Sequence, residues 1–160
     1  MRQWKSMLAK CMSVFVLAFL ISCLTVAAFA STYVTGSTWS FTIGGNEYNN
    51  HSMLNYYDAA SGGSSYLTDT TFINCNNSCP AGYLGAMAGI YIQNENGTYT
   101  LVKASAWKYS TSSSKSFYSQ ISNTYPRNGH YIGSGQTAVY YNGQYQEKWT
   151  YGTPIIMVHQ

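Results

Sequence analysis

The segment from Tyr83 to Tyr109 alternates in character with a period of two, and this alternation restricts the fold more than any other feature of the chain. Aliphatic side chains occupy every second position from Leu84 to Ile92, with Tyr, Gly and Met between them. A turn-type sequence, Gln93 to Gly97, separates this run from a second alternating run. Successive side chains of a strand point to opposite faces, so the pattern predicts an antiparallel hairpin. A helix from Leu84 to Ile92 is the competing interpretation, and its two glycines argue against it.

A second hairpin is predicted around Asn142-Gly143. The segments Gln136 to Tyr141 and Gln144 to Tyr151 alternate on either side of this dipeptide. Asn-Gly favours a two-residue type I′ turn, because both central residues need a positive φ.

The rest of the chain after residue 30 has the same strand and turn chemistry. We expect Tyr33 to Ile43 and Glu47 to Tyr57 to pair around Gly44-Gly45, and Tyr66 to Asn74 to form a further strand. All sixteen Tyr lie after residue 30, and Tyr fits the half-buried surface of a pleated sheet. The regular spacing of turns predicts a single antiparallel β-sandwich or small barrel of about seven to eight strands.

The first thirty residues have the pattern of a helical signal peptide. The positive charges Arg2, Lys5 and Lys10 precede an apolar run from Cys11 to Val26, and Ala28-Phe29-Ala30 before Ser31 fits a cleavage site. We therefore expect residues 1–30 to be a cleaved signal peptide and residues 31–160 to be a single secreted β-domain without a membrane span. The expected location is extracellular.

Two alternatives to cleavage exist within the same run. Cys11 to Ala30 is twenty uncharged residues, which is long enough to span a bilayer as a retained anchor. Leu20 to Cys23 resembles a lipobox, in which Cys23 would carry a lipid anchor. The small residues at Ala28 and Ala30 favour cleavage over the anchor, and the apolar residues that follow Cys23 argue against the lipoprotein.

Removal of the leader changes the charge balance. The whole chain has eight Lys and Arg against five Asp and Glu, but three of the bases lie in the leader. The expected mature chain is therefore neutral and very poor in charge. The pI near 8.6 is that of the whole precursor, so it does not indicate a basic surface for nucleic acid on the mature chain.

Only Cys75 and Cys79 remain after cleavage. In an exported protein this pair predicts a disulfide across the tight Cys-Asn-Asn-Ser-Cys loop, with Pro80 after it. A redox pair would need a C-x-x-C spacing, and a metal site would need further ligands that no sequence cluster provides. We expect no metal and no cofactor.

No catalytic motif is found. The histidines His51, His130 and His159 are dispersed, and the abundance of Ser makes a pairing with Asp58 or Asp69 uninformative. We expect a protein that is not an enzyme, although a hydrolase with a dispersed site stays an alternative.

Recognition through aromatic side chains fits the composition better. Tyr and Trp offer a flat apolar ring with a hydrogen-bonding tip, which suits neutral, hydroxyl-rich ligands and protein partners. The richest segment predicts a binding set of Tyr140, Tyr141, Tyr145, Trp149 and Tyr151. In a Tyr-rich sheet many of these rings will instead be core. The expected partner is a cell-envelope component, a polysaccharide or a protein.

Three segments resemble a group of small exported proteins of Gram-positive bacteria: Pro80 to Ala86, Leu101 to Tyr109 and Gly135 to Gly143. The resemblance spans about half of the chain after residue 30 and implies secretion and a bacterial source, but it assigns no catalytic residue. The signal, size and Tyr, Gly, Ser and Asn content are also loosely similar to secreted bacteriocins. A secreted bacteriocin or toxin-like effector is thus the alternative function.

Overall fold

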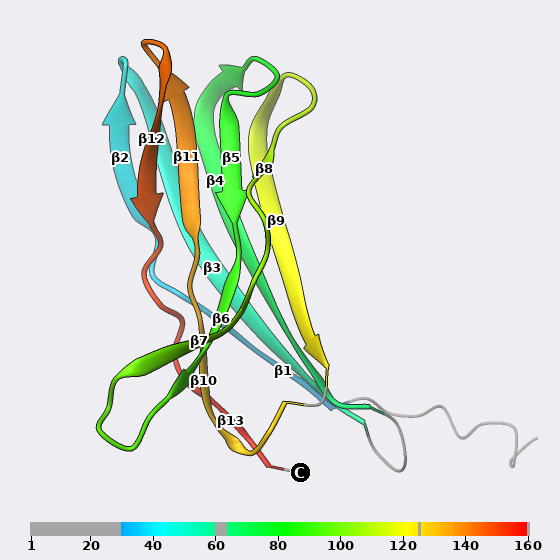
Figure 1. Cartoon of the computed structure of the whole chain (residues 1–160). Helices are drawn as coiled ribbons and strands as arrows, with labels where there is room; N and C mark the ends of the chain where they lie inside the picture. The colour runs from blue at the N-terminus through cyan, green and yellow to red at the C-terminus, as the bar shows by residue number, and fades with distance from the viewer. Residues whose placement is uncertain (1–29, 60–63, 125, 160) are drawn as a thin grey trace, which may run out of the picture.

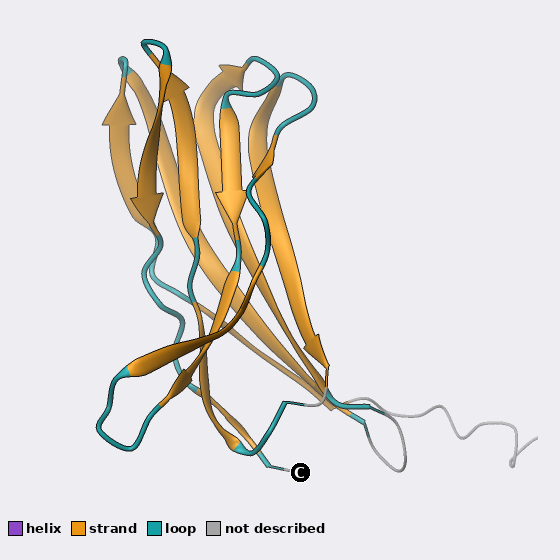
Figure 2. Cartoon of the chain, in the orientation of Figure 1, coloured by secondary structure: helices purple, strands orange, loops and turns teal. Residues whose placement is uncertain are grey.

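The computed structural model describes residues 30–59, 64–124 and 126–159, which form thirteen strands and no helix (Figure 2). The strands are β1 Ala30–Thr35, β2 Trp39–Ile43, β3 Asn46–Asp58, β4 Tyr66–Cys79, β5 Leu84–Met87, β6 Gly89–Gln93, β7 Tyr99–Ala104, β8 Lys108–Tyr109, β9 Ser114–Thr124, β10 Gly129–Gly133, β11 Gln136–Tyr141, β12 Gln144–Trp149 and β13 Ile156–Val158. The predicted all-β class is confirmed. The predicted leader, with Cys23, lies outside the described residues except for Ala30.

The strands form three antiparallel sheets in two layers (Figure 1). The long sheet has the order β1-β3-β4-β9, and β2 also pairs with β3. The β11 sheet has the order β12-β11-β5-β8, and the β10 sheet has the order β13-β10-β6-β7. The β11 and β10 sheets follow one another along the second layer, so the long sheet lies against both. None of the three sheets closes into a barrel within the described part of the chain.

Both hairpins with strong local signals are confirmed. The alternating aliphatic residues from Leu84 to Ile92 are all at most 5% exposed, and β5 and β6 pair with β8 and β7 as the predicted hairpin requires. The β11–β12 turn has φ of 49° at Asn142 and 82° at Gly143, as a type I′ turn demands. The predicted pairing around Gly44-Gly45 is formed by β2 and β3.

The predicted count of seven to eight strands is wrong, because several strands of the second layer are interrupted at a common level. Side chains there take the place of neighbouring strands as hydrogen-bond partners. The amide of Gly89 donates to Asp69 Oδ2 at 3.1 Å, and the amides of Gly133 and Gly135 donate to Thr153 and Thr150 Oγ1, each at 2.9 Å. These bonds mark the level at which β6, β10 and β13 are separated from β5, β11 and β12, where some backbone bonds persist, such as that from the Ser134 amide to the Gly89 carbonyl at 3.0 Å.

A buried polar belt at this level divides the core in two. The belt is formed by Asn50, Ser52, Asp69, Thr71, Thr137, Thr150 and Thr153. On the β10 sheet side the core contains Leu54, Tyr56, Leu67, Ile90, Ile92, Tyr131, Ile156 and Val158. On the β11 sheet side it contains Tyr48, Ile73, Cys75, Cys79, Leu84 and Val139. Both clusters combine residues of the long sheet with residues of the opposite layer, and this packing joins the two layers.

The predicted disulfide is absent from this structure, in which Cys75 and Cys79 are free and buried. The physical reason is that the predicted tight loop does not form. β4 continues through these residues, with a register shift against β9 between Asn74 and Cys79. The side chains of Asn76 and Asn77, between the two cysteines, bond to the start of β3. Asn76 Oδ1 accepts from the backbone amide of Glu47 at 3.2 Å, and the side-chain amide of Asn77 donates to Asn46 Oδ1 at 2.9 Å. The thiols therefore serve as small core groups.

Candidate binding face

The outer surface of the β11 sheet is the strongest candidate site. Directly opposite residues of an antiparallel pair share a face. Val139 and its partner Leu84 are buried, so the alternate residues of β11 and β5 point outward. Tyr140 opposite Tyr145, Ala138 opposite Glu147 and Gly85 opposite Tyr109 thus lie on the outside.

Five rings form a connected group on this surface, which we call the aromatic face: Tyr83, Tyr140, Tyr145, Tyr109 and Trp107. Tyr140 contacts Tyr83 and Tyr145 edge to face, with centroids 5.3 and 5.2 Å apart. Tyr145 lies 4.6 Å from Tyr109, and Tyr109 lies 6.1 Å from Trp107 with its plane within 15°. These centroid distances are typical of interacting aromatic pairs, so each ring restricts the orientation of its neighbours.

Small residues beneath the rings allow this arrangement. A Cβ on Gly85 would lie 2.7 Å from two ring carbons of Tyr109 and 3.3 Å from the Cβ of Ala138. Tyr109 therefore covers Gly85, and the short side chain of Ala138 leaves room for the rings to reach across the strands. A glycine inside a strand often marks such a close approach.

Hydrogen bonds hold the edge of the aromatic face. The Tyr145 hydroxyl donates to the Gly82 carbonyl at 2.8 Å, and the Tyr140 amide donates to the Tyr83 carbonyl at 2.9 Å. Gly82 has a φ of 80° in the turn that leads into β5. The face is therefore preorganised, which reduces the entropy that a ligand must overcome on binding.

The aromatic face is half-exposed and carries little charge. Tyr83 and Tyr145 are 38% and 40% exposed. Glu147 stands opposite Ala138 on the same face. Burial raises the pKa of Tyr109, and the nearby Tyr145 and Glu147 raise it further. The phenol therefore stays protonated and available as a donor at neutral pH.

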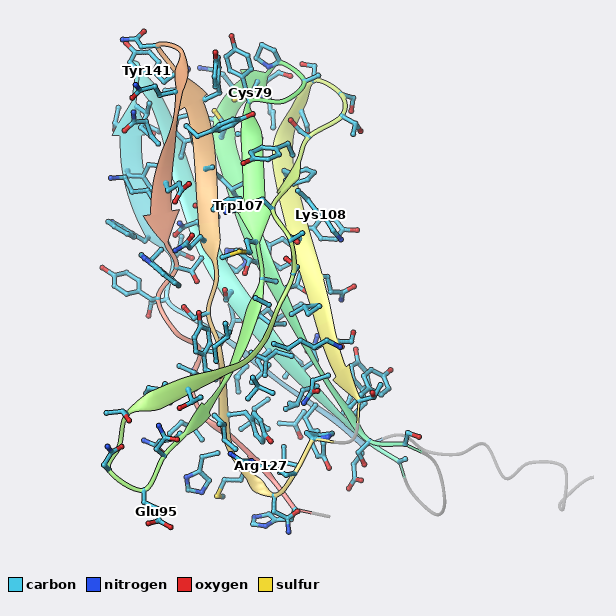
Figure 3. The ribbon with its side chains drawn as sticks, in the orientation of Figure 1. Cys79, Glu95, Trp107, Lys108, Arg127 and Tyr141 are labelled. Atoms are coloured by element: carbon cyan, nitrogen blue, oxygen red, sulfur yellow. The ribbon has the colours of Figure 1, made fainter. Side chains whose placement is uncertain are left out.

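The structure unites only part of the predicted binding set. Tyr140 and Tyr145 belong to the aromatic face, and Trp149 lies on the same side of β12, opposite Gln136. Tyr141 lies on the other side of β11, with a ring carbon 2.7 Å from where a Cβ on Gly44 would be. Figure 3 places Tyr141 at the β11–β12 turn, apart from Trp107 beside β8.

Tyr151 also lies away from the aromatic face, with its ring 5.8 Å from that of Trp39. Conversely, the sequence did not identify Tyr83, Tyr109 and Trp107 as binding residues. The alternation of the first hairpin indicated that these three rings lie on one side of it. Their approach to Tyr140 and Tyr145 depends on β5 pairing with β11, and no local signal reports that pairing.

Other candidate sites are weaker. A groove of about 600 Å³ at the far end of the β10 sheet is lined by one acid, Glu95, and one base, Arg127, among mostly neutral polar residues. The described residues contain no group of three or more His, Cys, Asp or Glu that could hold a metal ion. The same residues include no helix that is long and apolar enough to cross a membrane.

Comparison with known proteins gives no relative from which a function could be transferred: no family model, no curated protein and no solved structure matches the chain.

Proposed function

We propose that this protein is an exported, non-enzymatic recognition domain that binds a neutral polysaccharide of the bacterial cell envelope through the aromatic face. The observation that carries the proposal is the connected set of five half-exposed rings on one rigid sheet. Tyr and Trp rings pack against the apolar faces of sugar rings, while their tips and the neighbouring amides bond to hydroxyl groups.

The predicted leader supports export to the place where such a polymer occurs. Cleavage after Ala30 would leave β1 to start at Ser31, which pairs with Tyr57, so nearly the whole strand would be kept. The low charge of the expected mature chain supports an uncharged ligand, because electrostatic steering toward an anionic polymer would need a basic surface. Mass spectrometry of the protein from culture medium tests the cleavage site.

A binding assay on insoluble polymers tests the proposal. Purified protein is incubated with Gram-positive cell wall, chitin and cellulose, and the retained fraction is measured. We expect retention on at least one of them, weakened by about tenfold in Tyr145→Ala or Trp107→Ala, since removal of a central aromatic contact commonly costs more than about 1 kcal/mol.

The matched control is Tyr99→Ala. Tyr99 is 42% exposed, like Tyr145, but lies on β7 of the β10 sheet. Equal weakening by the control and by the aromatic-face variants would contradict the proposal, and so would a wild-type protein that none of the polymers retains. Killing of related strains by purified protein without such retention would favour the effector alternative.

A further inference from the structure

The long sheet and the β11 sheet form opposite layers of the molecule (Figure 1). The outer surface of the long sheet carries a second set of rings. His51, Phe72 and Tyr118 are direct neighbours across β3, β4 and β9. The rings of His51 and Phe72 are 4.9 Å apart and nearly parallel, and Phe72 and Tyr118 are 5.8 Å apart. The buried partners Asn50 and Ile73 show that this row points away from the core.

A second ring pair lies further along the same strands. Tyr57 and Tyr66 face one another with centroids 4.5 Å apart and planes within 19°. Tyr57 is six residues from His51 on β3, which corresponds to about 20 Å along an extended strand. The two ring groups therefore mark the ends of an elongated surface rather than a single point.

Hydrogen-bonded amides and hydroxyls occupy the outward positions at and between these rings. The Asn74 amide donates to Asn49 at 3.0 Å, and Gln120 donates to Thr70 at 3.2 Å. The Thr68 and Ser122 hydroxyls are 3.1 Å apart. These cross-strand pairs keep the polar side chains flat against the sheet. Gln120 and Ser122 are exposed, so their remaining donors and acceptors meet solvent, where a hydroxyl-rich ligand would contact them. Thr68 and Thr70 are only 4% exposed and hold these exposed partners in place.

No charged side chain occupies the outward positions of the described ladder from Asn49 to Tyr57 on β3, nor those opposite on β4 and β9. Burial lowers the pKa of His51, so this imidazole is also uncharged at neutral pH. Lys103 donates to the Ser122 carbonyl at 2.8 Å at the edge of β9. We call this surface the second face: His51, Phe72, Tyr118, Tyr57 and Tyr66 with the polar pairs between them.

We propose that the second face is an additional binding site for a neutral polysaccharide, so that one molecule bridges two polymer chains. This inference rests on the function proposed above. The chemistry of the two faces is the same: rings for the apolar faces of sugars, and neutral donors and acceptors for their hydroxyls. A protein partner fits less well, because the core of a protein interface is a continuous apolar patch. On the second face the polar residues Asn55, Gln120 and Ser122 interrupt the apolar surface between the two groups of rings, although Met53 and the exposed Tyr33 also face outward there.

The stoichiometry of binding tests the inference. A soluble hexasaccharide of the polymer that retains the protein is titrated calorimetrically into wild-type protein, Tyr118→Ala and Tyr145→Ala. Tyr118 is 57% exposed, so its truncation should leave the fold intact, and the thermal midpoint of each variant checks this. We expect two sites in the wild type. In each single variant one site should stay unchanged while the other weakens by about tenfold, and in the double variant, Tyr118→Ala with Tyr145→Ala, both should weaken.

A bridging assay gives an independent readout. Wild-type protein should aggregate a suspension of fine polymer particles, while Tyr118→Ala should still bind the particles but no longer aggregate them. Tyr99→Ala again serves as the control and should behave as the wild type.

Each result has a distinct meaning. A single site that is lost in Tyr145→Ala and unchanged in Tyr118→Ala would overturn the second face but leave the proposed function standing. Failure of the wild-type protein to bind any saccharide would overturn both. Capture of a purified envelope protein that requires Tyr118, without saccharide binding at this face, would overturn the choice of polysaccharide.

Discussion

Asp69 should make this protein less stable as the pH rises toward neutrality, in contrast to most buried acids with partners. The carboxyl is fully buried in the polar belt and accepts bonds at Oδ2 from the Gly89 amide at 3.1 Å and the Thr71 hydroxyl at 3.2 Å. Oδ1 has no hydrogen-bond partner among the described residues, and it lies against Gly133, where a Cβ would be 3.0 Å from the Asp69 Cγ. Among the described residues no cation is paired with it.

Burial raises the pKa of Asp69 from 3.8 to about 7, although the two hydrogen bonds act in the opposite direction. Because the folded pKa exceeds the unfolded one, the folded state holds its proton more tightly. Its contribution to stability is fully present below about pH 4 and is lost as the pH rises through 7. Each pKa unit corresponds to about 1.4 kcal/mol, so the full loss is on the order of 4 kcal/mol. The charge of Asp69 is also a secondary cause, after burial, of a raised pKa at Tyr91.

The assay is urea unfolding followed by tryptophan fluorescence, from about pH 4 to about pH 8, on the wild type and Asp69→Asn. Asparagine has nearly the shape of the protonated acid and no charge to bury. We expect the difference in unfolding free energy between variant and wild type to grow in favour of the variant as the pH rises, by up to about 4 kcal/mol. Asp58→Asn, at an exposed carboxylate, controls for the loss of a negative charge. A difference that stays flat between pH 4 and 8 would refute the reasoning.

Three further predictions test individual parts of the structure. Gly85→Ala should displace the Tyr109 ring, weakening polymer binding while costing about 1 to 3 kcal/mol of stability, measured by retention and urea unfolding; unchanged retention would argue against the role of this ring. Cys75 and Cys79 should resist alkylation in the folded protein, because both are buried and because burial and then a hydrogen bond with Cys75 raise the pKa of Cys79 to about 11. Both should react in denaturant without a reductant; a denatured chain that takes up no label would show a disulfide instead. Asn142→Ala should lower stability by about 1 to 2 kcal/mol in thermal unfolding, since its φ of 49° is strained for alanine, and Asn142→Gly should not.

The sequence predicted the parts of this fold whose causes are local. The Asn142-Gly143 turn and the alternation from Leu84 to Ile92 carry their own conformational and burial signals, and both were placed correctly. Whether Cys75 and Cys79 form a disulfide could not be predicted from local signals. It depends on the amide bonds that extend β4 alongside the start of β3, which is distant in the sequence.

The aromatic face was only partly predictable for a related reason. Alternation assigns a ring to one side of its own strand, as it did for Tyr140 and Tyr145. Whether that side meets Tyr109 depends on the order β11-β5-β8, which arises from the packing of the whole core. The breaks between β5 and β6 and between β10 and β11 follow from side chains that replace ladder partners, and strand propensity contains no signal for them.

The polar belt supplies information that the hydrophobic pattern of β4 lacks. Residues Leu67 to Thr71 are all buried, so burial alone does not distinguish the two faces of this strand. Within this segment Thr occupies both faces, so these positions do not set the register by themselves, whereas Leu67 and Ile73 favour the observed faces because they lie in the two core clusters. In the observed register Asp69 meets the Gly89 amide, and Thr71 lies 3.0 Å from the hydroxyl of its partner Ser52. Those bonds break in any other register, leaving buried groups unpaired at about 1 to 3 kcal/mol each. We therefore interpret the cost of burying Asp69 at neutral pH as offset by a unique register, which is also what aligns Phe72 with His51 and Tyr118 on the second face.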